Sequence, residues 1–220
     1  MFPVCGKGYH GNTEVQGKFK GMKTEYGDVT GVILVGGRSA RMGRDKAFLP
    51  LGGATFFERA LAAMKRHLET IFLVGDRPER FTRYGLRVYP DIYPGSALGG
   101  LHTAVSRAIT SYVFVSPCDL PYASPDVMQY LISLREGFDV VVPFSRGYPE
   151  PLFALYSRNC LEPMRDLLEA GNFRIFDFYP LIRVRRVPET ELAPIAGSEK
   201  AFLNINTMEE YEGILDGGGK

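Results

Sequence analysis

The stretch that decides the fold is 31–46, which reads GVILVGGRSARMGRDK. Its first residues, Gly31 to Val35, form a continuous apolar run, which is typical of a parallel strand buried on both faces. Gly36 and Gly37 follow directly and permit positive φ angles and a close backbone approach. The stretch therefore predicts a buried strand whose carboxyl end leads into a glycine-rich loop. Open α/β sheets bind their ligands at that edge.

Short apolar runs alternate with longer amphipathic segments along the rest of the chain. Strands are predicted at 71–74, 86–89, 112–115, 140–142, 152–156 and, as an edge strand, 183–187, and 202–205 is predicted to close the sheet. Helices are predicted at 55–68, 98–109, 125–134 and 159–169, and Thr207 with Glu210 forms a capping box before a last helix. This order predicts an α/β fold: a Rossmann-like, three-layer α/β/α arrangement. Its twisted sheet is mostly parallel, with some antiparallel strands in the C-terminal half.

Length and composition indicate one soluble domain. The 220 residues suffice for a single α/β core. We expect residues 1–27 to be a disordered lead-in, residues 28–215 to form the domain and residues 216–220 to be a flexible tail. A net charge of +1 argues against broad nucleic-acid or membrane binding. No apolar run reaches about 18 residues and no secretory pattern is present, so we expect a cytoplasmic protein.

The histidines and the arginines of 183–187 predict no site of their own. His67 and His102 have no metal-ligand spacing, and each is interpreted as a surface histidine or a hydrogen-bonded helix histidine. Arg183, Arg185 and Arg186 are interpreted as a solvated face that protects a sheet edge, rather than a nucleic-acid site. The three cysteines show no CxxC spacing, which predicts a reduced chain without structural zinc.

Basic residues give the glycine-rich loop its predicted function. Arg38, Arg41, Arg44 and Lys46 place four positive charges within nine residues, beside N–H groups that can form an anion-binding concavity. Such a charge density suits a triphosphate. The GxGxxG fingerprint is absent, and the P-loop pattern fails because Arg44 follows Gly43 where that pattern needs lysine. A solvated basic turn is the competing interpretation, but the position after a buried strand favours an anion site.

A second strand end carries an acid, in the segment 113–121, VFVSPCDLP. Asp119 is expected at the same sheet edge, where a hard carboxylate suits Mg²⁺ bound to phosphate oxygens. Helix capping is the competing role, but Ser124 already precedes the next helix as its cap. Cys118 has no base nearby and is predicted to be buried rather than nucleophilic. Asp91 ends another predicted strand and could either bond a nucleotide or form a turn, and both interpretations stay open.

Together these residues resemble the molybdenum cofactor guanylyltransferase (MobA) family. The resemblance rests on LVGGRSARMGRDK at 34–46, on the acid at 91 before a glycine-rich helix entry, on PCDLP at 117–121 and on LNINT at 203–207. It covers the chain from about Thr30 to about Tyr211. The first motif is shared with sugar-nucleotide pyrophosphorylases and other nucleotidyltransferases of the glycosyltransferase-A-like superfamily. The asparagine motif points toward the guanylyltransferase branch.

The resemblance implies an enzyme that transfers GMP from GTP to the phosphate of Mo-molybdopterin, forming the guanine dinucleotide cofactor and pyrophosphate. It implies Mg²⁺ as cofactor, held by Asp119, and Lys46, Arg41 and Asp119 as catalytic residues. Other implied partners are proteins of molybdenum cofactor biosynthesis or recipient molybdoenzymes, with neither nucleic acid nor membrane. The implied binding residues are Leu34, Val35, Gly36, Gly37, Arg41, Lys46, Asp91 and Asp119 for GTP, and Asn204 and Asn206 for the acceptor.

The sequence departs from the family pattern at four places. Val35 stands where the family usually has alanine, and 96–98 reads Ser-Ala-Leu in place of Gly-Pro-Leu. The end of the second strand, 74–76, lacks an asparagine, and Met208 replaces a common proline. Three of these positions touch the nucleotide side. A cytidylyl- or other nucleotidyltransferase acting on molybdopterin or on a sugar or alcohol phosphate therefore stays an alternative, as does a non-catalytic nucleotide-binding protein.

Overall fold

The computed structural model of the protein describes residues 26–36, 46–205 and 207–217. The predicted lead-in up to residue 25 lies outside the described residues, as do Asn206 and the loop 37–45 with Gly37, Arg38, Arg41 and Arg44. Within the part of the chain that is described, the N–H of Tyr26 donates to the carbonyl of His67 (3.4 Å), so the packed chain begins no later than Tyr26.

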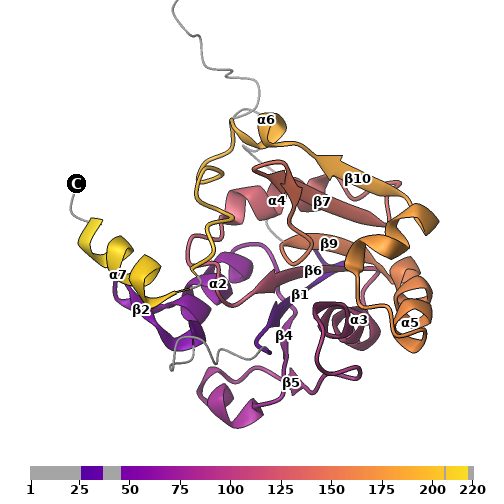
Figure 1. Ribbon diagram of the computed structural model, residues 1–220, viewed down its shortest axis with the longest axis horizontal. Coiled ribbons are helices and arrows are strands. Elements are labelled where there is room, and N and C mark those ends of the chain that lie inside the picture. The colour runs from indigo at the N-terminus through magenta and orange to yellow at the C-terminus, as the bar shows by residue number, and fades with distance from the viewer. Residues whose placement is uncertain (1–25, 37–45, 206, 218–220) are drawn as a thin grey trace, which may run out of the picture.

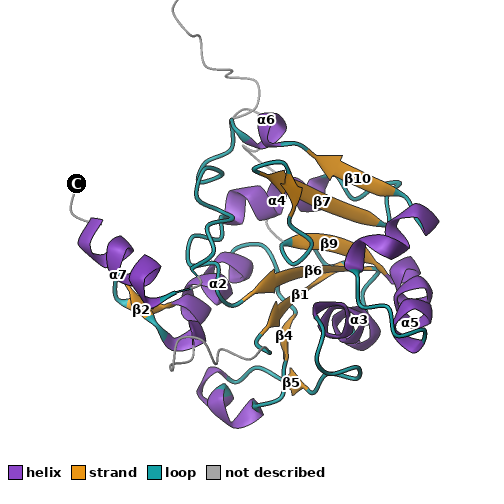
Figure 2. Cartoon of the chain, in the orientation of Figure 1, coloured by secondary structure: helices purple, strands orange, loops and turns teal. Residues whose placement is uncertain are grey.

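A mostly parallel sheet runs through the middle of the molecule (Figures 1 and 2). Its strand order is β10-β7-β9-β6-β1-β4-β5, with β8 paired to β7. Among the described strands of this sheet, only the pairings made by β9 and by the short β8 are antiparallel. The strands are β1 (Val29–Leu34), β4 (Ile71–Val74), β5 (Val88–Tyr89), β6 (Tyr112–Pro117), β7 (Val140–Ser145), β8 (Tyr148–Pro149), β9 (Ala154–Ser157) and β10 (Val184–Val187).

Helices cover both faces of this sheet, which confirms the predicted three layers. The α-helices are α2 (Phe56–Lys65), α3 (Ala97–Arg107), α4 (Pro125–Ser133), α5 (Leu161–Glu169), α6 (Glu189–Leu192) and α7 (Met208–Gly217). Short 3-10 helices lie at η2 (Lys46–Phe48), η3 (Pro78–Arg80), η4 (Thr82–Tyr84), η5 (Arg158–Cys160) and η6 (Ile175–Leu181), and a two-stranded hairpin joins β2 (Pro50–Leu51) to β3 (Ala54–Thr55). No helix among the described residues is long and apolar enough to cross a membrane.

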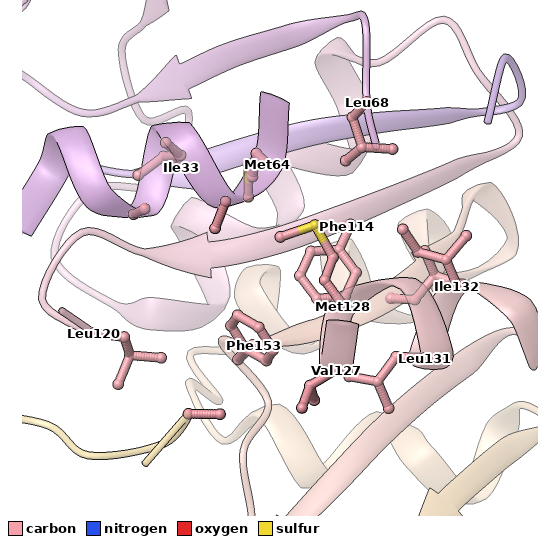
Figure 3. Close-up of a cluster of buried hydrophobic side chains, with 14 of the residues drawn as sticks. Ile33, Met64, Leu68, Phe114, Leu120, Val127, Met128, Leu131, Ile132 and Phe153 are labelled. Atoms are coloured by element: carbon pink, nitrogen blue, oxygen red, sulfur yellow. The ribbon is translucent and has the colours of Figure 1, made fainter. Parts of the chain in front are cut away.

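The alternation of side chains along the buried strands divides the core in two. Ile33 packs with the helices α2 and α4, whereas its neighbours Val32 and Leu34 pack with α3 and α5. Figure 3 shows the first cluster, where Phe114 of β6 lies among Met64 of α2 and Met128 of α4. Because β1 is apolar at every position except Thr30 and Gly31, it can be covered on both faces, as its sequence predicted.

Helix caps explain where several helices begin. Thr55 and Glu58 form a capping box at α2, and the hydroxyl of Ser124 accepts from the N–H of Val127 (3.3 Å) at α4. The predicted capping box before the last helix is confirmed, because Thr207 and Glu210 bond each other's backbone N–H groups at 3.2 Å and 3.1 Å.

The structure corrects the prediction that 202–205 closes the sheet, because this segment is an irregular loop. Ile205 is 1% exposed and packs with Leu51, Phe56 and Tyr211 in a small separate cluster. Its burial against a helix and the β2–β3 hairpin produces the apolar pattern that resembled a strand. The edge position predicted for 183–187 is confirmed, since β10 is the outermost strand beside β7.

The prediction that His67 and His102 are surface or hydrogen-bonded side chains is also wrong. His67 and His102 are 5% and 6% exposed, and neither nitrogen of His67 nor Nδ1 of His102 has a hydrogen-bond partner. The ring of His102 packs edge-on against Tyr93, with ring centroids 5.0 Å apart. Burial lowers the pKa of both histidines, because charging an imidazole away from water is unfavourable. Both therefore act as neutral core side chains.

Candidate active site

The carboxyl ends of three neighbouring strands, β1, β4 and β6, meet at one edge of the sheet (Figure 1). Leu34, the last residue of β1, stands level with Val74 of β4 and with Pro117 of β6. Beyond the strands, the N–H of Cys118 donates to the carbonyl of Leu34 (3.2 Å), and the N–H of Val35 donates to Val74 (2.9 Å). The structure thus brings the first and second predicted motifs together.

Gly75 allows the turn after β4 to lie against the turn after β1. A Cβ atom on Gly75 would stand 2.8 Å from Cγ2 of Val35 and 3.0 Å from the backbone nitrogen of Gly36. Cβ atoms essentially never make the first of these contacts, and the second is tighter than most, so a larger residue would push the two turns apart. The half-buried Val35 and the exposed Gly36 consequently present their backbone at the sheet edge.

Lys46 and Asp119 face each other at this edge, with Nζ 3.9 Å from Oδ2. Their side chains are 15% and 24% exposed. Buried neighbours hold both in place, because Ala47 follows Lys46 and Leu120 follows Asp119. Burial raises the pKa of Asp119, and the ammonium of Lys46 partly offsets that rise. The pair is therefore a cation beside a carboxylate that has lost much of its solvation.

Asp91 lies beside the end of β1. One of its oxygens forms a turn, which is one of the two interpretations that the sequence allowed. Oδ1 accepts from the N–H of Tyr93 (3.0 Å) and from the hydroxyl of Thr103 (2.9 Å). Oδ2 points toward Gly100, whose Cβ, if present, would stand 3.9 Å from Oδ2 and 3.7 Å from Leu34. Burial raises the pKa of Asp91, while those hydrogen bonds oppose the rise.

The first turn of α3 is the glycine-rich helix entry after Asp91, and its N-terminal cap was not predicted from the sequence. The hydroxyl of Ser96 caps the helix by accepting from the N–H of Gly99 (3.0 Å). A Cβ on Gly99 would lie 1.9 Å from the carbonyl of Tyr93, so only glycine fits there. The positive end of the helix dipole faces the sheet edge near Asp91. The closely spaced glycines 95, 99 and 100 identified this entry in the sequence.

The remaining predictions concern Cys118 and the asparagines of the C-terminal motif. Cys118 is half-buried, which corrects the prediction that it is a buried residue. Burial raises the pKa of its thiol to about 12, which agrees with the interpretation of Cys118 as a non-nucleophile. Asn204 is exposed on the loop before α7, next to the buried Ile205. The positions of Gly37, Arg41 and Asn206 relative to this edge lie outside the described residues.

The residues of the edge fit a hard divalent cation that is shared with a phosphate. No group of three or more His, Cys, Asp or Glu side chains able to hold a metal occurs in the described ranges, so a cage made only of protein ligands is not formed there. Mg²⁺ is commonly held by one or two carboxylates together with substrate phosphates and water. A partly desolvated carboxylate at Asp119, beside a lysine, matches that pattern.

Paired glycine turns, a lysine and a carboxylate at the carboxyl edge of a mostly parallel sheet define a nucleotide-binding α/β protein. The chain belongs to the MobA-like NTP transferase family, whose model matches residues 31–184. It is 40% identical over 182 residues to a probable molybdenum cofactor guanylyltransferase of Pelotomaculum thermopropionicum, covering 82% of this chain and 89% of that protein. It is 35% identical over 187 residues to the molybdenum cofactor guanylyltransferase of Desulfosudis oleivorans, covering 84% and 93%.

A solved structure supports the same fold. The molybdopterin-guanine dinucleotide biosynthesis protein A of Archaeoglobus fulgidus matches with a TM-score of 0.72 and 24% identity, over 83% of this chain and 95% of that one. The α/β architecture, the family resemblance and the assignment as a nucleotidyltransferase, all expected from the sequence, are thereby confirmed.

Proposed function

We propose that this nucleotidyltransferase transfers GMP from GTP to the phosphate of Mo-molybdopterin, forming molybdopterin guanine dinucleotide and releasing pyrophosphate. The observation that carries the proposal is the 40% identity, over 82% of this chain, to a probable molybdenum cofactor guanylyltransferase. The facing side chains of Lys46 and Asp119 beside the end of β1 support it, because this chemistry needs a cation and a carboxylate at the phosphates.

The transfer requires no general base from the protein. A phosphate monoester is already ionised near neutral pH, so one of its oxygens can attack the α-phosphorus of GTP directly. A phosphorus–oxygen bond forms there, and the bond from the α-phosphorus to the oxygen bridging to the β-phosphorus breaks, which releases pyrophosphate. We assign Lys46 and Arg41 to the neutralisation of the phosphate charge, and positioning contributes the rest of the rate enhancement.

Mg²⁺ is the cation we assign to Asp119, and when bound it would neutralise phosphate oxygens of GTP. Lys46, which faces Asp119, would contact the same phosphates. Asp91, whose Oδ2 lies near Gly100, is assigned to the nucleoside. Asn204 and Asn206 are assigned to the acceptor side, on the strength of the family motif.

Guanine recognition falls to backbone groups after β1. Guanine presents N1–H and N2–H₂ donors and an O6 acceptor. The carbonyl of Leu34 already accepts from the N–H of Cys118, and the N–H of Val35 already donates to Val74. We therefore assign to the base the carbonyl of Val35 and the peptide groups of Gly36 and Gly37. Because backbone groups do the recognition, valine at position 35 in place of alanine has only to fit sterically.

The remaining assignments concern the whole chain. We propose that residues 28–215 act as one nucleotidyltransferase domain, and we note that α7 extends it to Gly217. We place the reaction in the cytoplasm, with GTP and molybdopterin as substrates. Other molybdenum cofactor biosynthesis proteins or recipient molybdoenzymes would take the product.

The test is a competition between two nucleotides in one reaction. Purified protein is incubated with Mg²⁺, molybdopterin and equal concentrations of GTP and CTP, and the dinucleotide products are separated. The proposal predicts the guanine dinucleotide in large excess, because a site that pairs guanine donors leaves its buried acceptors unpaired with a base that lacks them. A cytosine product would refute the guanylyl assignment. No transfer to molybdopterin from either nucleotide would refute the acceptor.

A further inference from the structure

Arg59, on helix α2, reaches from its helix to two other segments of the chain. Its Nε donates to the carbonyl of Pro121 (2.6 Å) and its Nη1 donates to the carbonyl of Leu51 (3.3 Å). The guanidinium also lies over the ring of Tyr122, 5.7 Å from its centroid. A half-buried arginine whose guanidinium donates to backbone carbonyls of two segments fixes the position of those segments.

The first of these segments carries Asp119. On one side of the aspartate, the N–H of Cys118 donates to the end of β1. On the other side, the carbonyl of Pro121 accepts from Arg59 and the side chain of Leu120 is 3% exposed. The carboxylate therefore sits on a short turn that is held at both ends, and Arg59 provides one of the two attachments.

The second segment begins with Lys46. The chain runs from Lys46 through η2 to Leu51 of β2, and the N–H of Leu49 donates back to the carbonyl of Lys46 (3.1 Å). Leu49 and Leu51 are buried in the small cluster with Phe56 of α2. Through Leu51, Arg59 attaches this segment to the same helix that holds the turn of Asp119.

We propose that Arg59 is a positioning residue that fixes Asp119 relative to Lys46, so that the carboxylate and the ammonium meet one metal-bound triphosphate together. The proposal rests on the proposed function, because it needs Asp119 as the metal ligand. Arg59 contacts neither the substrate nor the metal in this assignment. Outer groups that orient the ligands of a metal are typically worth about 10–100-fold in metal affinity or activity.

The test compares binding of GTP with and without a metal, in the absence of an acceptor so that no turnover occurs. Dissociation constants for Mn²⁺-bound GTP and for metal-free GTP are measured calorimetrically. Arg59→Met, which keeps an aliphatic stem but removes both donors, is expected to weaken Mn²⁺-GTP binding by about 10–100-fold and to leave metal-free GTP binding unchanged. Arg59→Lys keeps a charge and one donor position, and it is expected to restore part of the loss.

Arg66→Met is the matched control. Arg66 is an exposed residue at the end of the same helix, and it lines the same open groove of about 550 Å³ as Arg59. It is expected to bind both forms of GTP like the wild type. If Arg59→Met does not fold, Arg59→Lys carries the test, because it must still show a selective loss for the metal-bound form.

Two outcomes would overturn the proposal, and they differ from a failure of the proposed function. Equal weakening of both forms of GTP by Arg59→Met would make Arg59 a residue of general nucleotide binding. A lowered melting temperature with unchanged Mn²⁺-GTP binding would make it a residue of stability alone. If instead the wild type shows no preference for Mn²⁺-GTP, or Asp119→Asn keeps that preference, the metal site assigned to Asp119 is wrong and the positioning role fails with it.

Discussion

Two aspartates at opposite edges of the same sheet have opposite surroundings. Asp119 follows the carboxyl end of β6, whereas Asp139 immediately precedes the amino end of β7. The strand β9 lies between them and is antiparallel to both, so β6 and β7 point in the same direction. Asp119 and Asp139 therefore lie at opposite ends of the strands of one sheet.

Asp139 is saturated with hydrogen bonds. Its oxygens accept from the backbone and guanidinium of Arg183 at 3.0–3.2 Å, from the amide of Asn159 (2.7 Å) and from the hydroxyl of Ser157 (3.2 Å). These donors hold the pKa of Asp139 well below its usual range, with Arg183 as the largest cause. This carboxylate joins β7, β9 and β10, and its bonding capacity is used within the protein.

Asp119 differs from Asp139 in its bonding partners and in the direction of its pKa shift. Its ion pair with Lys46 is long, at 3.9 Å, and burial raises its pKa rather than lowering it. A desolvated carboxylate with weak compensation is unfavourable for stability, and such groups concentrate at functional sites. The difference supports the proposed ligand role of Asp119, because burial disfavours the charged form of this acid, whereas the carboxylate of Asp139 is stabilised by hydrogen bonds within the protein.

The largest expected effect concerns activity at the carboxyl edge. Asp119→Asn preserves size but removes the charge that a metal needs, so guanylyl transfer is expected to fall to the background rate. Added Mg²⁺ is not expected to restore it, because an amide oxygen is a much poorer ligand than a carboxylate. The measurement is product formation over a range of Mg²⁺ concentrations. Substantial activity in this variant would mean that another acid holds the metal and that Asp119 does not differ from Asp139 in the way proposed.

Lys46→Ala tests the other half of the pair. The ammonium faces phosphates whose charge is redistributed in the transition state, and one such donor is worth about 10²–10³-fold in rate. We expect kcat to fall by that factor and the affinity for GTP to fall less. Steady-state kinetics at saturating GTP, together with binding measurements, separate the two effects. Weaker binding with an unchanged kcat would show that Lys46 holds only the ground state.

The sequence predicted the features that depend on neighbouring residues better than those that depend on contacts between distant parts of the chain. The layers and most strand and helix positions follow from local patterns, because buried parallel strands such as β1 are apolar throughout. The segment 202–205 was wrongly predicted to be a strand, because burial in a small cluster also produces an apolar pattern. Arg59 could not be identified, since its partners are backbone carbonyls of residues far along the chain or eight positions away. Backbone partners leave no pattern in the sequence.

Asp139→Asn is the matched change at the amino edge. It replaces one acceptor oxygen by an NH₂ group that faces donors, so it is expected to lower the free energy of unfolding by about 1–3 kcal/mol. The loss is limited because the side chain of Arg183 is 64% exposed and can be solvated. Activity per folded molecule is expected to stay at the wild-type level. Denaturant unfolding and initial rates provide the two measurements.

Glu162→Gln is the control for Asp139→Asn. Glu162 also pairs with an arginine, Arg165, at 3.5 Å, but its side chain is 80% exposed. An exposed pair of this kind contributes about 0–1 kcal/mol. Equal destabilisation by the two variants would show that burial and hydrogen bonding give Asp139 no special role.

The smallest expected effect is a change in stability of opposite sign at the two edges. The raised pKa of Asp119 means that the folded state favours its protonated form, so the stability this group contributes is present below its unfolded pKa and is lost as the pH rises through the folded pKa. Asparagine imitates the neutral form, and Asp119→Asn is therefore expected to be slightly more stable than the wild type at neutral pH. That advantage is expected to disappear in acid.

Asp139 has the reverse dependence, because its folded pKa is lowered. Its stabilisation is present above the unfolded pKa and is lost as the pH falls through the folded pKa, so the deficit of Asp139→Asn shrinks only in strong acid. Melting curves of both variants and the wild type across acidic and neutral pH measure the two trends. A destabilised Asp119→Asn at neutral pH would mean that the pair with Lys46 more than offsets the desolvation of Asp119, and the carboxyl edge would then be built for stability like the amino edge.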